Sequence, residues 1–457
     1  MNAAGAASLG GEPALSTARI FRTWWPLAAG WLLMTLEIPV ISAAVARRPE
    51  PEINLAAWGL VFSLSLILGS PAIMMLGTST TLSRDWASFR RVSRYNLVLS
   101  IALTAVHALL AFTPLFDLVV VQLIAPPPEI VEPARIGLRI MLPYVLALSY
   151  RRLNYGVLIR FGDARAVTTG AALRLAADTI ALVLLFTATD VSGIVMATLT
   201  FVTGILVEAL YAGLRVRPVL RGPLRTAPPA AEPLTLPVFT RFYMPLVMTS
   251  LLQILVQPVG AAALSRMPDP LQSLAVWPVV YGLLMLFNSG GMAFTEAVVV
   301  LLDEPRSVKP LHRFTVSTGL TMVALLAVMV GSPMSEVWFR QVAALPDTLV
   351  ALARVGVLIL LPLPGLTFLQ SWHTGMLMMS RRTRAVTESV VLALATNVAV
   401  LILGMTWGDF PGLYVGLAGL AAGNYARTAW LWYRTRRIKT VLLERELAVN
   451  PEWAGAG

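Results

Sequence analysis

Long runs of apolar residues alternate with short polar breaks along almost the whole chain. A membrane-spanning helix needs about 20 consecutive, mostly apolar residues, and the runs are of this order. The pattern predicts an all-α integral membrane protein with twelve transmembrane helices at approximately 22–45, 55–80, 95–121, 135–159, 166–188, 193–214, 240–264, 274–301, 314–339, 354–379, 385–405 and 411–433.

Basic residues collect in every second polar break. Breaks such as 84–94 and 434–445 are rich in arginine, whereas the intervening breaks together contain only Arg47, Arg48, Arg266 and Arg340. Cytoplasmic loops of membrane proteins carry the excess of Lys and Arg. The pattern therefore predicts an inner (plasma) membrane protein that crosses the bilayer an even number of times, with both termini in the cytoplasm.

Composition narrows the possible classes of function. Of 457 residues, 57% are apolar and only 13% are charged, against about 25% charged in a typical soluble protein. A water-soluble enzyme is therefore excluded. The net charge of +11 is spread in short groups between apolar runs, so we expect the lipid bilayer as partner and no nucleic acid.

Several kinds of chemical site are also excluded or not expected. The chain has no cysteine and only three histidines, which excludes disulfides and thiolate sites and makes a histidine-rich metal site unexpected. The sequence contains no phosphate loop and no catalytic-triad spacing. It therefore predicts neither an enzyme nor a bound cofactor, and a transporter of this kind would use a proton or sodium gradient.

The two halves of the chain are repeats at an offset of 219 residues. Over residues 22–94, 22 of 73 positions are identical to the residues 219 further on. The matches include helix-breaking prolines and loop arginines, which shared hydrophobicity does not explain. Examples are Pro26 with Pro245, and Arg47 with Arg266. Six spans in each repeat place both halves the same way up, an arrangement typical of transporters with a substrate site between the halves.

The repeat divides the chain into five segments. We expect a disordered N-terminus at 1–18, an N-lobe of six spans at 19–216 and a C-lobe of six spans at 238–437. Between the lobes, residues 217–237 are rich in Pro and Ala, which predicts a cytoplasmic linker. Residues 438–457 form a cytoplasmic C-terminal tail.

This organisation, together with short sequence strings, resembles the MOP exporter superfamily. The string YGVLIRFGDAR at 155–165 is similar to a loop motif of multidrug and toxic compound extrusion (MATE) transporters. Four further strings are similar to the progressive ankylosis branch: WGL at 58–60, FSL at 62–64, PLP at 362–364 and HTGMLM at 373–378. Members of that branch export anions such as citrate, nucleotides and pyrophosphate. The resemblance implies a MATE-like fold and a monomer.

Polar residues in the fourth predicted span suggest a substrate site. Arg151 and Arg152 follow only ten apolar-leaning residues, so the pair is expected within the membrane zone. Arginine suits bidentate binding of carboxylate or phosphate. Two interpretations fit the pattern. Either the arginines form an anion site that faces the space between the lobes, or their side chains snorkel to the cytoplasmic interface. The candidate substrate-binding residues are Arg151, Arg152, Asn154, Tyr155 and Arg139, with Gln370 and His373 in the tenth span; a structural hydrogen bond is the other interpretation of His373.

Acidic residues within the spans are candidates for ion coupling. Glu37 precedes Pro39 in the first span, where it serves either as an ion site or as a partner of Arg151 or Arg152. Arg174 and Asp178 are four residues apart and lie on one helical face. Charges within a membrane span usually face a cavity or a partner.

Two further features are less specific. Glu208 and Arg427 occupy equivalent repeat positions, and their opposite charges allow a pair between the lobes. Glu296 follows Asn288-Ser289-Gly290-Gly291, which is either an unwound ion-lining segment or a close helix contact.

The sequence thus predicts a secondary active transporter that exports an organic or phosphate-bearing anion by alternating access. An integral membrane transferase and a non-transporting scaffold or receptor are alternatives from other classes, and two further transport alternatives also remain open at this point. The first is a flippase for a lipid-linked sugar phosphate or pyrophosphate, in which the same arginines bind the phosphate groups. The second is a MATE-type multidrug cation antiporter, which requires an acidic cavity.

Overall fold

The computed structural model describes residues 15–229, 233–302, 304, 306–380 and 384–448. Most of the N-terminus expected to be disordered, and the end of the C-terminal tail, lie outside the described residues. All regular structure within the described part is helical. Ten helical segments are long and apolar enough to cross a membrane. The two other expected spans, 135–159 and 411–433, fall on the more polar α5–α6 pair and on α18, so the count of twelve stays a prediction.

The first repeat contains ten elements. In chain order they are α1 (Thr17–Val45), α2 (Pro51–Ile73), α3 (Met75–Leu82), α4 (Trp86–Phe112), the π-helix η1 (Asp117–Ile124), α5 (Pro128–Ile140), α6 (Tyr144–Arg160), α7 (Arg165–Ala188), α8 (Gly193–Arg221) and α9 (Pro223–Thr226). Helices α8 and α9 therefore continue into the segment predicted as a linker.

The second repeat follows the same order. Its elements are α10 (Leu236–Ile254), α11 (Val256–Leu264), α12 (Pro270–Leu301), α13 (Val308–Gly331), α14 (Met334–Glu336), the π-helix η2 (Val337–Val342), α15 (Asp347–Leu360), α16 (Leu363–Met379), α17 (Arg384–Trp407) and α18 (Gly412–Ala448). Helix α18 extends well past the predicted end of the last span.

Backbone geometry confirms the duplication independently of side-chain identity. Glu50 and Asp269, which are 219 residues apart, both adopt a left-handed conformation directly before a proline that starts a helix. Ala125 and Ala344 are also left-handed and are also 219 residues apart. A positive φ is uncommon outside glycine, so two coincident pairs indicate one ancestral backbone.

Prolines explain where the predicted spans had the wrong bounds. The spans at 95–121 and 314–339 were predicted as continuous, but α4 ends at Phe112 and α13 ends at Gly331. Pro114 and Pro333 lie two residues after these helix ends, and proline lacks the N–H that would continue the helix. The chain then turns into the π-helices η1 and η2.

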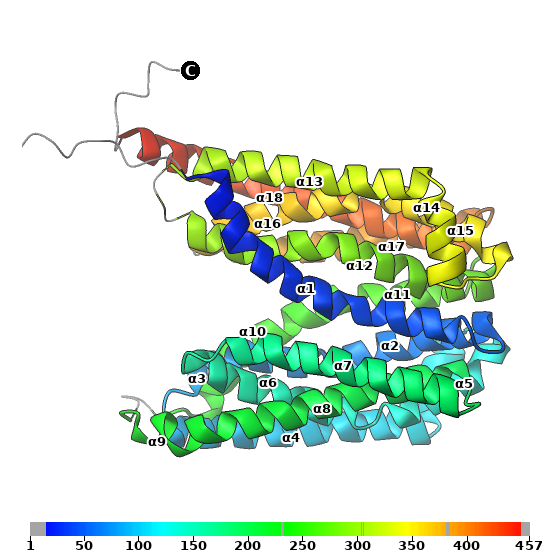
Figure 1. The fold of residues 1–457 in the computed structure, drawn as a ribbon, viewed down its shortest axis with the longest axis horizontal. Coiled ribbons are helices and arrows are strands. Elements are labelled where there is room, and N and C mark those ends of the chain that lie inside the picture. The colour runs from blue at the N-terminus through cyan, green and yellow to red at the C-terminus, as the bar shows by residue number, and fades with distance from the viewer. Residues whose placement is uncertain (1–14, 230–232, 303, 305, 381–383, 449–457) are drawn as a thin grey trace, which may run out of the picture.

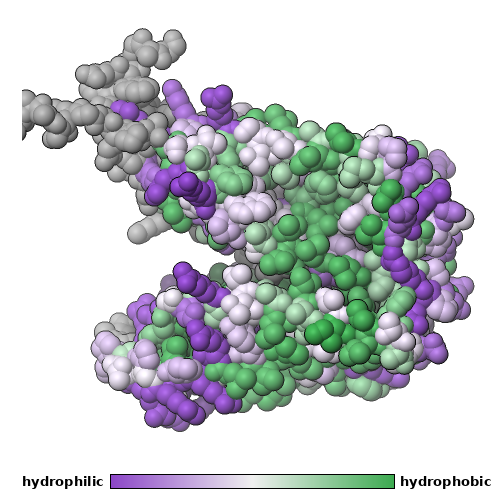
Figure 2. All heavy atoms as spheres, in the orientation of Figure 1, coloured by the Kyte–Doolittle hydropathy of each residue, from purple (hydrophilic) through white to green (hydrophobic). Residues whose placement is uncertain are grey.

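The two repeats form two bundles arranged as a V (Figure 1). One bundle, the N-lobe, contains α2–α9, and the other, the C-lobe, contains α12–α18. The start of α1, the short helix α9 and the end of α18 lie at the open end, and α5 and α14 lie at the closed end. The space-filling view shows a wedge-shaped cleft with polar residues near its mouth and an apolar band across the middle of the molecule (Figure 2).

Helix α1 belongs to both lobes. Its first half packs along α12 of the C-lobe, where the Trp24 indole Nε1 donates to the Gly290 carbonyl at 2.7 Å. At the same end, the Arg19 guanidinium pairs with the Glu304 carboxylate at 2.7 Å. Its second half contacts α7 of the N-lobe, where Glu37 meets Arg174, while Ile38 and Pro39 still lie against Gly282 of α12. Movement between the lobes must therefore bend or displace α1.

Two equivalent seams hold the closed end of the V together. Arg47, at the end of α1, donates to the carbonyls of Val342 at 2.9 Å and of Gln341 in the opposite lobe. Arg266, its repeat counterpart, donates to the carbonyls of Ile124 at 3.1 Å and of Leu123. These two seam arginines cap exposed carbonyls of the π-helices in both directions across the lobe boundary.

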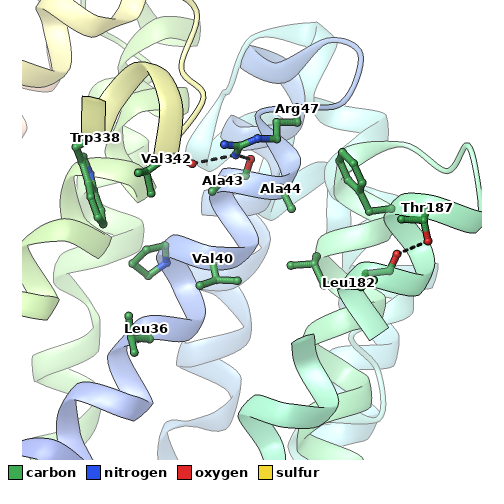
Figure 3. Close-up of a pocket in the computed structure, with 12 residues that line it drawn as sticks. Leu36, Val40, Ala43, Ala44, Arg47, Leu182, Thr187, Trp338 and Val342 are labelled. Atoms are coloured by element: carbon green, nitrogen blue, oxygen red, sulfur yellow. Dashed lines mark hydrogen bonds between the residues drawn. The ribbon is translucent and has the colours of Figure 1, made fainter. Parts of the chain in front are cut away.

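An apolar groove accompanies each seam arginine. The groove beside Arg47 has a volume of about 420 Å³ and lies between α1, α7 and η2, with Leu36, Val40, Leu182 and Trp338 on its walls (Figure 3). The groove beside Arg266 has about 450 Å³ and is lined by the repeat equivalents of most of these residues. The duplication has thus kept the seams nearly unchanged.

Candidate functional site

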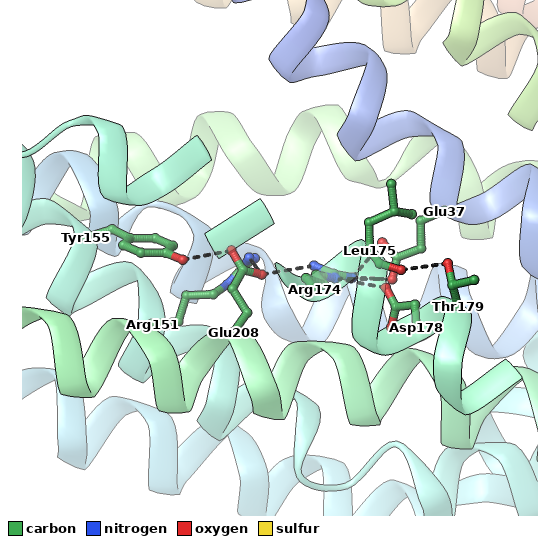
Figure 4. A network of polar contacts seen from close by, with 8 residues as sticks. All are labelled: Glu37, Arg151, Tyr155, Arg174, Leu175, Asp178, Thr179 and Glu208. Atoms are coloured by element: carbon green, nitrogen blue, oxygen red, sulfur yellow. Dashed lines mark hydrogen bonds and ion pairs between the residues drawn. The ribbon is translucent and has the colours of Figure 1, made fainter. Parts of the chain in front are cut away.

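Buried charged residues converge in a small pocket of the N-lobe, next to α1 (Figure 4). Arg174 on α7 lies at its centre, and its guanidinium binds the Glu37 carboxylate of α1 with nitrogen–oxygen distances of 2.6 and 2.7 Å. The same guanidinium lies 3.7 Å from Asp178 and 3.7 Å from Glu208. One arginine therefore connects three carboxylates from three helices.

A second ion pair extends this network. Arg151 on α6 pairs with Glu208 on α8, and the Tyr155 hydroxyl donates to the other Glu208 oxygen at 3.2 Å. Arg151 is 4% exposed and Glu208 is 1% exposed. Breaking such a pair on one side leaves a buried charge without a partner, which is strongly destabilising. The network therefore fixes the relative positions of α1, α6, α7 and α8.

The local sequence explains how the charges come together. Arg174 and Asp178 lie one helical turn apart, as predicted, so both face the same neighbours. Gly204 on α8 leaves the necessary space, because a Cβ there would overlap the Asp178 carboxylate. The pocket has a volume of only about 40 Å³, so its charged groups interact mainly with one another.

The pocket contains more acids than bases. Glu37, Asp178 and Glu208 line it, but only two basic residues, Arg151 and Arg174, do so. Neither oxygen of Asp178 has a hydrogen-bond partner in the described part of the chain. Arg152, buried beside Arg151 and close to Glu208, adds a third positive charge just outside the lining, so the acids outnumber the bases only at the pocket surface.

The other N-lobe candidates lie at different distances from this network. Arg152 is next to Arg151, and its buried Nε has no hydrogen-bond partner among the described residues; the same holds for Nδ2 of Asn154. Arg139 is exposed on α5, where its Nε donates to the Ala111 carbonyl at 3.2 Å. Arg139 therefore lies away from the network with which it was grouped.

Two predicted pairings are corrected by the structure. Glu37 pairs with Arg174 and not with Arg151 or Arg152, because α1 packs against α7 and Arg151 on α6 is bound to Glu208. The predicted pair between Glu208 and Arg427 does not form. Glu208 is already bound by two arginines of its own lobe.

The C-lobe contains a larger polar cavity. It has a volume of about 310 Å³ and is formed by α10, α11, α12, α16, α17 and α18, with Leu66 of α2 reaching it from the N-lobe. Gln370 lines it and donates through Nε2 to Asn424 Oδ1 at 3.1 Å and to Thr428 at 3.0 Å. The structure thus places Gln370 at a cavity, and Arg427 lies in the same wall.

His373 and Glu296 lie outside both pockets. The Nδ1 atom of His373 is 2.7 Å from the Thr435 hydroxyl on α18, a buried contact between helices. Glu296 is exposed on α12. The segment before it is not unwound: α12 is continuous, and Gly290 and Gly291 allow close contact with Trp24 and Phe368. The interpretation as a helix contact is confirmed.

Sequence reasoning missed the seam arginines and the centre of the network. In the sequence, Arg47 and Arg266 stand out only as matching residues in otherwise arginine-poor breaks. This match between the repeats was the available signal, because arginines in the loops with few basic residues do not serve to orient the protein in the membrane. The connection of Glu208 to Arg151 and Arg174 had no sequence signal, since these residues come from three separate helices.

The overall arrangement is matched by solved structures. An inward-facing MATE family transporter of the MOP superfamily superposes with a TM-score of 0.71 and 15% identity, covering 93% of this chain and 99% of that chain. The fold is MATE-like. An outward-facing MATE transporter of the same superfamily gives 0.62 and 18% identity, with coverage of 94% and 99%. The lipid II flippase MurJ, in an inward closed conformation, gives 0.66 and 12% identity, with coverage of 93% and 90%.

Comparison of sequences alone finds no counterpart: no family model and no curated protein matches this chain. The MATE-like fold therefore rests on the three-dimensional arrangement.

Proposed function

We propose that this MATE-like protein is a gradient-driven transporter that exports an organic or phosphate-bearing anion by alternating access. In this proposal it works as a monomer in the inner membrane, with both termini and the mouth of the cleft in the cytoplasm. The supporting fold features are the two repeated lobes, the cleft open at one end, and the paired seams at the other.

One observation carries the proposal: the buried pair between Glu37 and Arg174 lies on the helix that both lobes share. Helix α1 is held to the C-lobe by Trp24 and Arg19 and to the N-lobe network by Glu37. A change in the charge of the network would therefore alter how α1 binds the N-lobe. That is the kind of link alternating access requires between ion binding and lobe movement.

Asp178 is the proposed point of ion binding. It lines the pocket, it carries a negative charge when ionised, and its oxygens have no hydrogen-bond partner among the described residues. A proton or a sodium ion would neutralise that charge and weaken the attraction between Asp178 and Arg174. The Arg174 guanidinium could then bind Glu37 or Glu208 more closely. Since Glu37 lies on α1, this choice would favour one position of α1 over another.

The roles proposed for Arg151 and Arg152 differ from each other. Arg151 is balanced by Glu208, so in this proposal it stabilises the network and supports the anion site only indirectly. Arg152, with Asn154 beside it, retains unpaired nitrogen donors. These two residues stay candidates for contact with the anion when the lobes move.

The test is transport into proteoliposomes with a panel of citrate, pyrophosphate, a nucleotide and a lipophilic cation. The wild type is expected to accumulate an anion against its gradient when a proton or sodium gradient is imposed. Asp178→Asn should still exchange the anion across the membrane without a gradient, but should lose accumulation. The exposed Glu296 supplies the matched control, because Glu296→Gln should retain both activities.

Other outcomes would overturn parts of this proposal. Accumulation of the lipophilic cation alone would overturn anion export and support a multidrug cation antiporter. Equal accumulation by wild type and Asp178→Asn would exclude Asp178 as the coupling residue.

A lipid-linked substrate is the second candidate, favoured by the seam grooves. Each groove is apolar and lies beside an arginine at the boundary between the lobes (Figure 3). An acyl chain could occupy such a groove while the cleft holds its phosphate group. Absence of transport for every soluble compound in the panel, together with scrambling of a fluorescent lipid phosphate, would favour this candidate.

A further inference from the structure

The C-lobe cavity is the repeat equivalent of the charged pocket in the N-lobe. Every residue that lines the N-lobe pocket, when moved by 219 positions, becomes a residue that lines the C-lobe cavity. The eight equivalents are Leu252, Val256, Gln370, Val390, Ala393, Leu394, Asn397 and Arg427. The two sites therefore occupy equivalent positions in the two repeats, and the side chains at these positions differ.

The substitutions between the two sites invert the charge. In the C-lobe, Arg427 stands at the position of Glu208, and Asn397 stands at the position of Asp178. Val256 replaces the third acid, while Gln370 and Ala393 replace the two arginines. Among the described residues that line the cavity, none is acidic and Arg427 is the one charged group.

Arg427 lacks the partners that its N-lobe equivalents have. Its Nε is buried without a hydrogen-bond partner, and no ion pair involving Arg427 occurs in the part of the chain that the structure describes. Asn288 and Asn397 also line the cavity, and each has a buried Oδ1 without a partner there. Buried polar groups are normally paired, so these three atoms point to a further hydrogen-bonding group in this space. The Arg427 Nε–H is a donor that suits an anion, whereas the two Oδ1 atoms are acceptors and suit a hydroxyl or protonated group of the same ligand.

We propose that the C-lobe cavity binds the transported anion, with the Arg427 guanidinium as its principal contact. The ligand class is a small organic or phosphate-bearing anion with at least one carboxylate or phosphate group. The role of this site in transport rests on the function proposed above, whereas anion binding itself does not.

The chemistry of the cavity fits this ligand. A planar guanidinium binds carboxylate and phosphate oxygens in a bidentate manner, and none of the described residues that line the cavity is acidic, so none of them competes with the anion for Arg427. Amide groups of Asn288, Asn397 and Asn424 can donate to further ligand oxygens. The volume of about 310 Å³ lies near the lower end of the usual range for ligand pockets, about 300–1,000 Å³, and so favours a small anion.

The cavity is also placed where a transported ligand would need it. Leu66 comes from α2 of the N-lobe, and Leu252 and Ile254 come from α10, which packs against α2. The cavity therefore reaches the contact between the lobes. A ligand bound at Arg427 lies next to the elements that separate when the lobes move.

Direct binding tests the site without any transport step. Radiolabelled citrate and radiolabelled pyrophosphate are measured by equilibrium dialysis on the full-length protein in detergent. Wild type should bind at least one of these probes, and Arg427→Gln should weaken that binding by about tenfold or more, the usual effect of losing a charged hydrogen bond. Arg434→Gln is the matched control, since Arg434 lies on the same helix but pairs with Glu388 outside the cavity.

Thermal unfolding in the same detergent shows whether the variants are folded. Because Arg427 has no described counter-charge, Arg427→Gln should unfold at the same temperature as wild type or higher in the absence of ligand. The anion that binds should raise the unfolding temperature of wild type and of Arg434→Gln, but not of Arg427→Gln. In Arg427→Glu the cavity is acidic, and binding of both anions should be lost.

The outcomes separate this site from the proposed function. Binding that depends on Arg427 without any transport would support the site and overturn the transporter. Anion binding and transport that are unchanged in Arg427→Gln would overturn the site and leave the transporter intact. Binding of neither probe by wild type protein that unfolds cooperatively would also overturn the site.

Discussion

The two lobes are built on one plan, but they treat charge in opposite ways. In the N-lobe pocket, Glu208 is bound by Arg151 and Arg174, and the site is nearly filled by its own ion pairs. In the C-lobe cavity, Arg427 replaces Glu208 and has no described partner, and the space is several times larger. One site satisfies its charges internally, whereas the other leaves a charge available to a ligand.

The seams teach the complementary lesson. Arg47 and Arg266 make the same kind of contact with the opposite lobe, and each has an apolar groove beside it. Duplication thus preserved the contacts that close one end of the V and changed the groups at the centre. The lobe movement can be symmetric while the chemistry in each lobe is different.

Loss of Arg174 should have the largest effect and should separate the lobes most clearly. Arg174→Ala leaves three carboxylates around one vacated position, and removing one side of a buried ion pair costs about 3–5 kcal/mol. Chemical unfolding in micelles is expected to show a loss of this size. Arg427→Ala, at the only charged lining position of the described C-lobe cavity, should cost less than about 1 kcal/mol because it strands no partner. Equal losses would contradict the contrast between the lobes.

Arg151 provides a test with a built-in rescue. Arg151→Gln should cost about 3 kcal/mol, since Glu208 loses its nearest counter-charge although Arg174 and Tyr155 remain. Adding Glu208→Gln removes the stranded charge, and the double variant is expected to recover most of the stability. The same unfolding experiment measures both variants. If the double variant is as unstable as the sum of the single ones, Arg151 and Glu208 are not coupled.

Substitutions of the two seam arginines should have equal effects on which end of the molecule is open, in contrast to substitutions at the centre of each lobe. Charged hydrogen bonds to carbonyls contribute about 1.5–3 kcal/mol, so Arg47→Gln or Arg266→Gln should raise the population of the state with the opposite end open about tenfold or more. The chain has no cysteine, so spin labels at Thr226→Cys and Lys309→Cys report the width of the cleft mouth. We expect a new, shorter distance in both variants.

Arg340 is the control for this measurement. It lies near the same end of the molecule, but it is about half-exposed and pairs with exposed Asp347, and exposed ion pairs contribute only about 0–1 kcal/mol. Arg340→Gln should leave the distance distribution unchanged. A shift for one seam arginine but not for the other would show that the two seams are functionally different despite their common geometry.

The fold could be predicted from the sequence because its signals are periodic and local. Apolar runs predicted most helices, and the 219-residue offset predicted the two lobes. The duplication is supported by two left-handed pairs, Glu50 with Asp269 and Ala125 with Ala344. Helix ends near Pro114 and Pro333 were placed wrongly, because average hydropathy does not register a missing backbone donor. The contact between Arg174 and Asp178 was predictable from helical spacing alone.

The partners of the charged residues could not be predicted in the same way. Glu37, Arg151 and Glu208 come from three helices, and which faces meet depends on packing that no single-helix pattern encodes. Repeat symmetry suggested a pair between Glu208 and Arg427, but equivalent positions in two lobes lie in two separate pockets. Symmetry predicts that their surroundings are equivalent, and not that they touch.

The smallest expected effect concerns Glu296, which tests whether position or residue type makes an acid functional. Glu296 is an acid within an apolar helix, as Glu37 is, but it is exposed on α12 and lies outside both pockets. Surface substitutions of this kind usually change stability by no more than about 0.5 kcal/mol. Glu296→Gln should therefore unfold like wild type and retain gradient-driven transport, both measured beside Glu37→Gln. Loss of accumulation in Glu296→Gln would mean that a second acidic site acts from the C-lobe, and the assignment of coupling to the N-lobe alone would fail.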